Sequence, residues 1–222
     1  MARKSIRDLT REQQMARGPI DLPFLMLTML LLAIGLVMLL SASSYAALYD
    51  KAAGYKVVDG VVQPDLDNDI LRIACVERYG KNGSIGRAFI KNFGLKSGAI
   101  AISVGHDHHN VSVVGSNPDD MALAVNRIQE LQGGLVFVDG GKVIEEIALP
   151  ICGLLANEPG EVIAEKLRAV IAAMAQRGCT VPSPNVTLSF ITLIFIPALA
   201  ISDQGLFDVS KFQIIDPVIS VE

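Results

Sequence analysis

All three histidines of the sequence lie in one short segment, His106-Asp107-His108-His109. Imidazole and carboxylate groups in this pattern suit two kinds of chemistry, divalent metal binding and proton transfer near neutral pH. In an extended chain, His106 and His108 lie on the same side, which makes them candidate metal ligands. Asp107 or Asp119 is the expected oxygen ligand or hydrogen-bonding partner at such a site.

A structural role for the same segment is the alternative. Asp107 and the following Asn110 then satisfy backbone groups, and the imidazoles form hydrogen bonds that stabilise a loop. No nucleophile elbow, P-loop or dinucleotide-binding fingerprint accompanies the histidines. The residue pattern alone therefore leaves metal binding, proton transfer and a structural loop open.

The composition excludes several classes of protein. The chain has 222 residues, of which 51% are hydrophobic and 19% charged, which excludes intrinsic disorder. A net charge of −4, 5% aromatic residues and no Trp argue against nucleic-acid binding. Cys75, Cys152 and Cys179 are widely spaced, so we expect buried thiols rather than a disulfide framework or a zinc site.

The apolar residues are concentrated near the N-terminus. Residues 22–49 carry no charge and are long enough as a helix to cross a hydrocarbon core of about 30 Å. Five basic residues precede this segment, so the positive-inside rule places residues 1–21 in the cytoplasm and the body outside. A transmembrane helix over 22–48 is favoured over a cleaved signal peptide or a buried soluble helix.

Beyond a junction at residues 49–56, residues 57–222 have the pattern of a folded domain. Asn117 before Pro118 predicts a helix that ends near Leu131, and two glycines predict a hairpin turn at 140–141. Residues 186–201 are apolar but contain Pro197, and we expect a buried β segment followed by a turn. The remaining expected elements are strands at 71–77, 86–91, 98–104, 111–114, 135–139 and 142–149, and a helix at 159–177.

These elements predict an α+β fold, with a mixed or antiparallel sheet and helices on one of its faces. The histidine segment then falls in a turn between two strands or at a strand end. The single predicted transmembrane helix precedes this domain.

The N-terminal segment resembles a known family. The run RGPIDLPFLMLTMLLLAIGLVMLLSASSYAALYD, within residues 17–50, is similar to the cytoplasmic lead and first membrane helix of the SEDS cell-division proteins. That family polymerises peptidoglycan with residues of later membrane helices. The resemblance therefore brings no catalytic residue to this chain.

A second and more extensive resemblance covers about residues 55–222. GLKSGAIAISVGHDHHNVSVVGSNPDDMALAVNRIQELQGGLVFVDGGKV, LPICGLLANEP and PSPNVTLSFITLIFIPALAISDQGLFDV follow the order found in the C-terminal domain of bacterial adenine deaminases. This resemblance implies hydrolysis of adenine to hypoxanthine and ammonia. It also implies a metal-dependent amidohydrolase barrel, in which bound Mn or Fe activates the attacking water.

The family's H-D-x-H-N motif matches His106, Asp107, His109 and Asn110, with His108 where Ser is usual. The resemblance implies accessory catalytic roles for His106, Asp107 and His109, and contact of Asn110 with the substrate. The family's barrel brings further His, Glu and Asp ligands, whereas this sequence has only the three histidines of one segment. We therefore expect little or no deaminase activity from this chain alone.

The partners expected from the resemblance are adenine and a separately encoded amidohydrolase barrel, and self-association is a further expectation. The two halves disagree about compartment, because a deaminase domain belongs in the cytoplasm. A gene fusion or rearrangement is one explanation. The alternative functions are a membrane-tethered binding domain without catalysis, and a SEDS fragment joined to an unrelated body.

Overall fold

The computed structural model describes residues 26, 29, 56–58 and 61–217. The predicted lead over 1–21, the transmembrane helix over 22–48 and the junction over 49–56 fall outside this part, apart from residues 26, 29 and 56. In the part of the chain that is described, no helix combines the length and the apolar character that crossing a membrane requires. The architecture below is that of the body.

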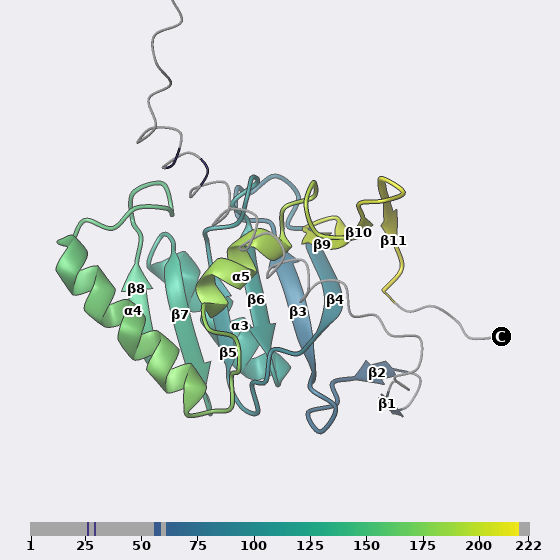
Figure 1. Ribbon diagram of the computed structural model, residues 1–222, viewed down its shortest axis with the longest axis horizontal. Coiled ribbons are helices and arrows are strands. Elements are labelled where there is room, and N and C mark those ends of the chain that lie inside the picture. Colours follow the sequence, from purple (N-terminus) through teal and green to yellow (C-terminus); the bar gives the residue numbers. More distant parts are fainter. Residues whose placement is uncertain (1–25, 27–28, 30–55, 59–60, 218–222) are drawn as a thin grey trace, which may run out of the picture. The chain divides into compact units, whose positions relative to one another are not determined.

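A six-stranded sheet forms the centre of the body (Figure 1). Its strand order is β4-β3-β6-β5-β7-β8, and every neighbouring pair is antiparallel. The predicted strands and the hairpin with two central glycines are confirmed, with ends shifted by a few residues at most. The bounds are β3 Ile70–Val76, β4 Ile85–Lys91, β5 Ala99–Ile102, β6 Val111–Gly115, β7 Gly134–Asp139 and β8 Lys142–Ala148.

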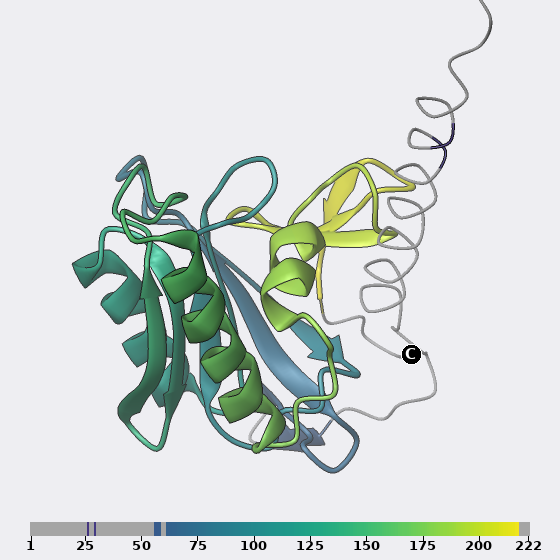
Figure 2. The same ribbon diagram turned by 60° about the vertical axis from the view of Figure 1, so that its left-hand side comes forward.

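Helices cover both faces of this sheet, so the prediction of helices on one face is wrong. Figure 2 shows α3 (Pro118–Glu130) on one side and α4 (Gly160–Ala175) with α5 (Pro184–Ile191) on the other. Strand β5 supplies both cores: Ala99 and Ala101 pack in the cluster beneath α3, and Ile100 and Ile102 in the opposite cluster. The strand is apolar at every position because neither face meets water.

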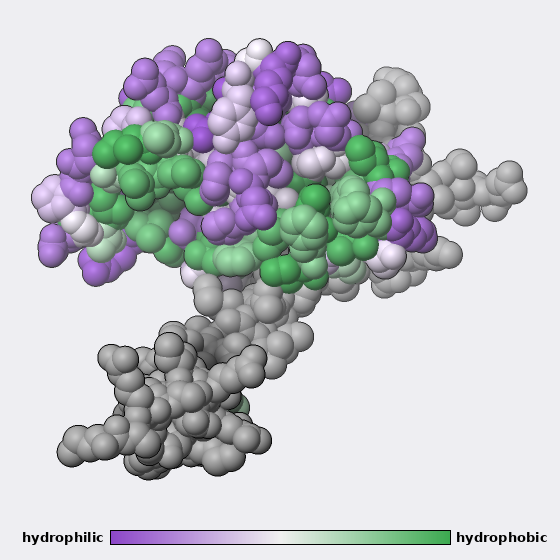
Figure 3. All heavy atoms as spheres, turned by 90° about the horizontal axis from the view of Figure 1, so that it is seen from above, coloured by the Kyte–Doolittle hydropathy of each residue, from purple (hydrophilic) through white to green (hydrophobic). Residues whose placement is uncertain are grey.

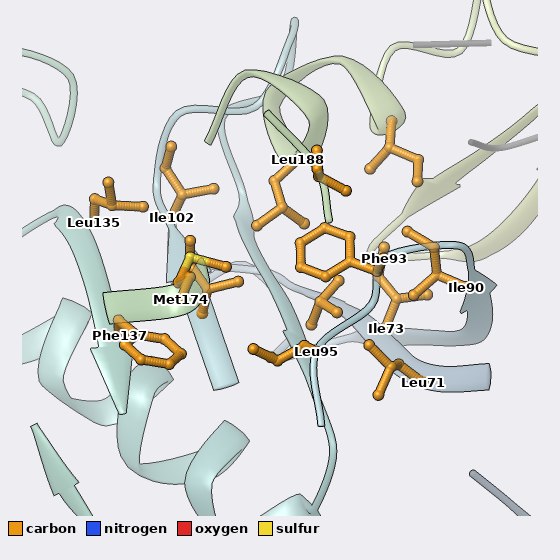
Figure 4. Packing of buried hydrophobic residues seen from close by; sticks show 14 of the residues in the cluster. Leu71, Ile73, Ile90, Phe93, Leu95, Ile102, Leu135, Phe137, Met174 and Leu188 are labelled. Atoms are coloured by element: carbon orange, nitrogen blue, oxygen red, sulfur yellow. The ribbon is translucent and has the colours of Figure 1, made fainter. Parts of the chain in front are cut away.

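The larger core lies between the sheet and the α4–α5 layer. Figure 4 shows this cluster, in which Met174 of α4 and Leu188 of α5 pack with sheet residues such as Phe137. Phe93 and Leu95, in the connection after β4, are also fully buried. Each such side chain contributes roughly 1.5–3 kcal/mol by leaving water. This core fixes the position of α5 relative to the end of β5.

The predicted β segment over 186–201 is wrong for its first half. Residues 184–191 form α5, and only Leu199–Ser202 forms a strand, β9. Pro184 occupies the first turn of the helix, where the absent N–H has no consequence. Leu188 and Ile191, three residues apart, are both buried. Local β propensity is overridden here because a helix buries this pair against the sheet.

Two small sheets complete the body. Strand β9 pairs with β10 (Gly205–Asp208), which pairs with β11 (Gln213–Ile215). Strands β1 (Lys56–Val58) and β2 (Val61–Gln63) form an antiparallel pair.

The three cysteines are free, and burial raises the pKa of Cys75 to about 12. Cys152 is exposed, so the expectation of buried thiols is wrong for this residue.

The predicted start of α3 is confirmed, and it also anchors the β7–β8 turn. The Asn117 side chain accepts a hydrogen bond from the Asp120 N–H at 2.8 Å, as an N-cap does. The buried Asp120 carboxylate accepts hydrogen bonds from the N–H groups of Gly140 and Gly141, at 3.2 and 2.8 Å. Both glycines have positive φ angles, 59° and 74°, which the two-residue turn requires.

We predict that Asp120→Ala lowers the free energy of unfolding by about 1–3 kcal/mol, because it removes the hydrogen bonds that the buried carboxylate accepts from Gly140 and Gly141. Urea denaturation measures the change. The matched control is the exposed neighbour Asp119→Ala, which we expect to alter stability by roughly 0.3–1 kcal/mol through the helix dipole alone. Equal effects of the two substitutions would contradict the anchoring role of Asp120.

Candidate functional site

The histidine segment lies in the loop that connects β5 to β6, residues 103–110. This loop is at the end of the sheet where β3 ends and the β8–α4 connection begins (Figure 1). Residues 106–108 form a turn, so the extended geometry behind the predicted pairing of His106 and His108 is absent. The His106–Asp107 peptide bond is cis, and Asp107 is exposed.

The structure brings together His106 and His109 instead. Their ring centroids are 5.9 Å apart in an edge-on arrangement, and the Phe190 ring of α5 lies 5.0 Å from His106. His108 has a different environment, since its Nδ1 atom accepts a hydrogen bond from the Asn110 N–H at 3.0 Å. The pair of imidazoles available for chemistry on this loop is therefore His106 and His109.

Helix α5 holds the first half of the loop. The Ser189 hydroxyl donates to the Val104 carbonyl at 2.8 Å, and the Thr192 hydroxyl donates to the His106 carbonyl at 3.2 Å. The His106 N–H donates to the Ser189 carbonyl at 3.0 Å. Ser189 and Thr192 are buried. These hydroxyls satisfy loop backbone groups that the sheet no longer pairs.

Residues after β3 and after β9 hold the second half. Arg78 and Tyr79 donate side-chain hydrogen bonds to the carbonyls of His109 and His108. The buried Asn110 amide accepts a hydrogen bond from the Arg78 N–H at 3.4 Å and donates one to Asp203 at 3.1 Å. Both ends of this amide are thus engaged within the protein, which favours a positioning role. The predicted contact of Asn110 with a substrate stays a prediction.

The electrostatic surroundings lower the pKa values of His108, His109 and Asp203. Burial lowers the pKa of His108 and of His109, and the neighbouring His106 and Arg78 lower that of His109 further. The buried Nδ1 atom of His109 has no hydrogen-bond partner among the described residues. Burial acts to raise the pKa of Asp203, but hydrogen bonds from Ser84 and Gln204 outweigh it and lower that pKa.

The donor set does not fit a complete site for Mn or Fe. In the described part of the chain, no group of three or more His, Cys, Asp or Glu side chains is arranged to hold a metal ion. The expectation that Asp119 joins the histidines is wrong, because β6 runs between the loop and α3 and separates the two by about 17 Å of strand. Metal binding by His106 and His108 stays a prediction, and it would need donors from elsewhere.

Exposed apolar side chains surround this end of the domain. They are Ile151 and Leu155 in the β8–α4 connection, Phe195 and Ile196 after α5, and Tyr79. Figure 3, seen from above, shows hydrophobic side chains in two areas with hydrophilic residues between them. A surface of this kind is typical of an interface with another protein or domain.

Sequence reasoning missed the residues that hold the loop: Arg78, Ser189, Thr192 and Asp203. A signal was present for two of them. Ser189 and Thr192 interrupt an apolar run, and buried hydroxyls in such a run need hydrogen-bond partners. Arg78 and Asp203 are distant in the sequence from the loop, and nothing local marks them.

We predict that Asp203→Asn destabilises the body by about 1–3 kcal/mol near pH 7, because three hydrogen bonds to a carboxylate are weakened. The folded pKa of Asp203 is lowered, so its contribution is present above the ordinary Asp pKa of about 3.9 and is lost as the pH falls through the folded pKa. Urea denaturation at several pH values should show the difference in unfolding free energy between wild type and Asp203→Asn shrinking on acidification. The control is Asp67→Asn at an exposed position. A difference in unfolding free energy that does not change with pH would contradict the role given to the Asp203 carboxylate.

Comparison with known proteins identifies close sequence relatives of the body. Residues 50–213 match the family described as "Adenine deaminase C-terminal domain". The SEDS-like segment over 17–50 lies almost wholly outside this range, and the match lends it no support.

Curated relatives agree with the family match. The chain is 48% identical over 159 residues to "Adenine deaminase" of Methanococcoides burtonii, 51% over 164 residues to "Adenine deaminase 1" of Carboxydothermus hydrogenoformans, and 48% over 160 residues to "Adenine deaminase" of Brucella melitensis. The matched regions cover 72–73% of this chain. They cover only 27–28% of the relatives' own length.

Proposed function

Because the chain belongs to the adenine deaminase C-terminal domain family, we propose that it supplies an accessory domain to an enzyme that hydrolyses adenine to hypoxanthine and ammonia. The observation that carries the proposal is the loop with the adjacent His106 and His109 rings and the exposed Asp107. These are groups that exchange protons or accept hydrogen bonds near neutral pH. They lie at a surface, where a second domain can complete the site.

The chemistry divides between this loop and the completing domain. Replacing the amino group at C6 by water needs an activated water and a proton for the leaving ammonia. The described residues provide no complete metal set, so water activation is assigned to the completing domain. The lowered pKa of His109 leaves its imidazole neutral at pH 7, so it is suited to accept a proton or to hydrogen-bond the purine. His106 and Asp107, on the same loop, act as accessory groups.

The partner is an amidohydrolase barrel, whether carried by another polypeptide or by the same one. The matched relatives have about three quarters of their length outside the region that this chain covers. The apolar side chains around the histidine loop are suited to bury against such a domain. Self-association through the same side chains is the competing outcome, and the mildly acidic charge disfavours nucleic acid as a partner.

Membrane attachment is a separate proposal that rests on the sequence alone. Residues 22–48 form an uncharged, apolar segment, and the single-pass topology with a cytoplasmic N-terminus follows from the basic residues before it. The body by itself favours the cytoplasm, where adenine is available. Carbonate extraction of membranes distinguishes an inserted chain from a peripheral one.

We predict no measurable turnover of adenine by the 222-residue chain alone with added Mn²⁺ or Fe²⁺. Co-expression with the barrel part of the Methanococcoides burtonii relative is expected to give adenine-dependent ammonia release. Turnover by the chain alone near ordinary enzyme rates, on the order of 10 s⁻¹, would contradict the accessory role.

In that reconstituted enzyme, the pair His106→Ala and His109→Ala is expected to lower kcat by roughly 10²-fold or more, because positioned acid–base groups contribute on this scale. Lys142→Ala, an exposed substitution in the β7–β8 hairpin at the opposite end of the domain, is the control. An unchanged kcat in the histidine variant would exclude the loop from the reaction.

A further inference from the structure

Arg78, which follows β3, makes two hydrogen bonds to the histidine loop. Its backbone N–H donates to the Asn110 side chain at 3.4 Å, and its Nε–H donates to the His109 carbonyl. Its Nη2 group donates to the Cys152 carbonyl at 2.8 Å. One guanidinium thus joins the loop to the β8–α4 connection. We propose that Arg78 is a positioning residue that sets the relative orientation of His106 and His109, an inference that rests on the function proposed above.

The loop needs such support at His109. This residue has a φ angle of 50°, in the left-handed region that is unfavourable for a residue with a Cβ. Its N–H donates to the Gly105 carbonyl at 2.6 Å, and its carbonyl accepts from Arg78. A hydrogen bond with a charged donor is roughly twice as strong as a neutral one. The Arg78 contact therefore stabilises the backbone conformation from which the His109 ring projects.

The surroundings of the guanidinium are shaped to hold it. A Cβ added at Gly153 would lie 2.0 Å from the Nη1 atom of Arg78, so the absence of a side chain there admits the guanidinium. The Tyr79 ring packs against it, with 4.9 Å between the Arg78 Cζ atom and the ring centroid. The Tyr79 hydroxyl donates in turn to the His108 carbonyl at 2.9 Å. Arg78 and Tyr79 together fasten the two consecutive carbonyls that precede Asn110.

A lysine cannot replace this arrangement. The guanidinium presents donors in a fixed planar fork, and here two of them meet carbonyls on two different loops. The ammonium group of lysine keeps the charge but offers a single nitrogen on a flexible stem. Arg78→Lys is therefore a conservative change in charge that removes the bridge.

The sequence makes a selective test possible, because its three histidines all lie in this loop. Histidine-labelled, full-length 222-residue chain in a mild detergent gives imidazole NMR signals from the loop alone. The spectra are recorded at one pH well above the ordinary histidine pKa of about 6.5. We expect wild type to show a nuclear Overhauser contact between the His106 and His109 rings. We also expect slow exchange of the His109 amide.

Arg78→Lys should abolish the ring contact and accelerate exchange of the His109 amide by about tenfold or more, because the loop opens locally. The urea midpoint should change little, which separates positioning from general destabilisation. The matched control is Arg72→Lys in the preceding strand β3, where the Arg72 side chain donates to Gln63 at 2.7 Å. We expect the wild-type histidine spectrum from this control.

An unchanged ring contact and amide exchange in Arg78→Lys would overturn the proposal, as would the same changes in Arg72→Lys. If Arg78→Lys does not fold, Gly153→Ala displaces the guanidinium while leaving Arg78 in place. The ring contact between His106 and His109 and the exchange rate of the His109 amide then test the proposal in that variant. In the reconstituted enzyme, Arg78→Lys should lower kcat at least tenfold with little change in KM. An inactive wild-type reconstitution would count against the deaminase function alone, since the NMR readings need no activity.

Discussion

The histidine loop leaves the sheet where β5 ends and β6 begins, and helices cover both faces of the sheet there. The rest of the structure depends on hydrogen-bond partners for the polar backbone groups of this loop. Both strands are buried on both sides, so the loop between them leaves the sheet in a largely dry environment. Side chains of other elements supply the missing partners. The Ser103 hydroxyl donates to the Gly153 carbonyl at 2.6 Å and accepts from the Gly134 N–H at 2.8 Å. The hydroxyls of α5, the Arg78 guanidinium and the Asp203 carboxylate serve the rest of the loop in the same way.

This constraint explains why the histidines are ordered without forming a site by themselves. The contacts hold the backbone of residues 104–110, while the Asp107 side chain is exposed and the His106 and His109 rings are half-buried. A loop whose backbone is held by hydrogen bonds and whose side chains are accessible is suited to bind a second protein surface. The exposed apolar residues around it lie at the same end of the domain, and the region matched in the Methanococcoides burtonii relative is 27% of that protein's length.

Much of the fold follows from local sequence pattern. The N-cap Asn117 with Pro118 sets the start of α3, and the two central glycines set the β7–β8 turn, as the structure confirms. The presence of helices on both faces was readable from β5, which is apolar at every position rather than at alternate ones. Helix α5 was not, because its Val, Thr, Phe and Ile residues favour a strand locally and only packing against the sheet decides.

The site was predictable in its position but not in its geometry. The motif located the loop, whereas the choice of His109 over His108 as the partner of His106 depends on a turn that side chains from three distant segments stabilise. The order of strands in the sheet brings Arg78 to the loop, and the packing of α5 and β9 on that sheet brings Thr192 and Asp203. Long-range contacts of this kind leave no local pattern in a single sequence.

We propose that a barrel domain covers this end of the domain, and hydrogen-exchange mass spectrometry tests this proposal most directly. The 222-residue chain is compared with and without the barrel part of the Methanococcoides burtonii relative. We predict slower amide exchange in residues 103–110, 150–156 and 193–197, with no change in the β7–β8 turn at 139–142 on the opposite end. Unchanged exchange at the histidine loop, or protection confined to the opposite end, would contradict the account.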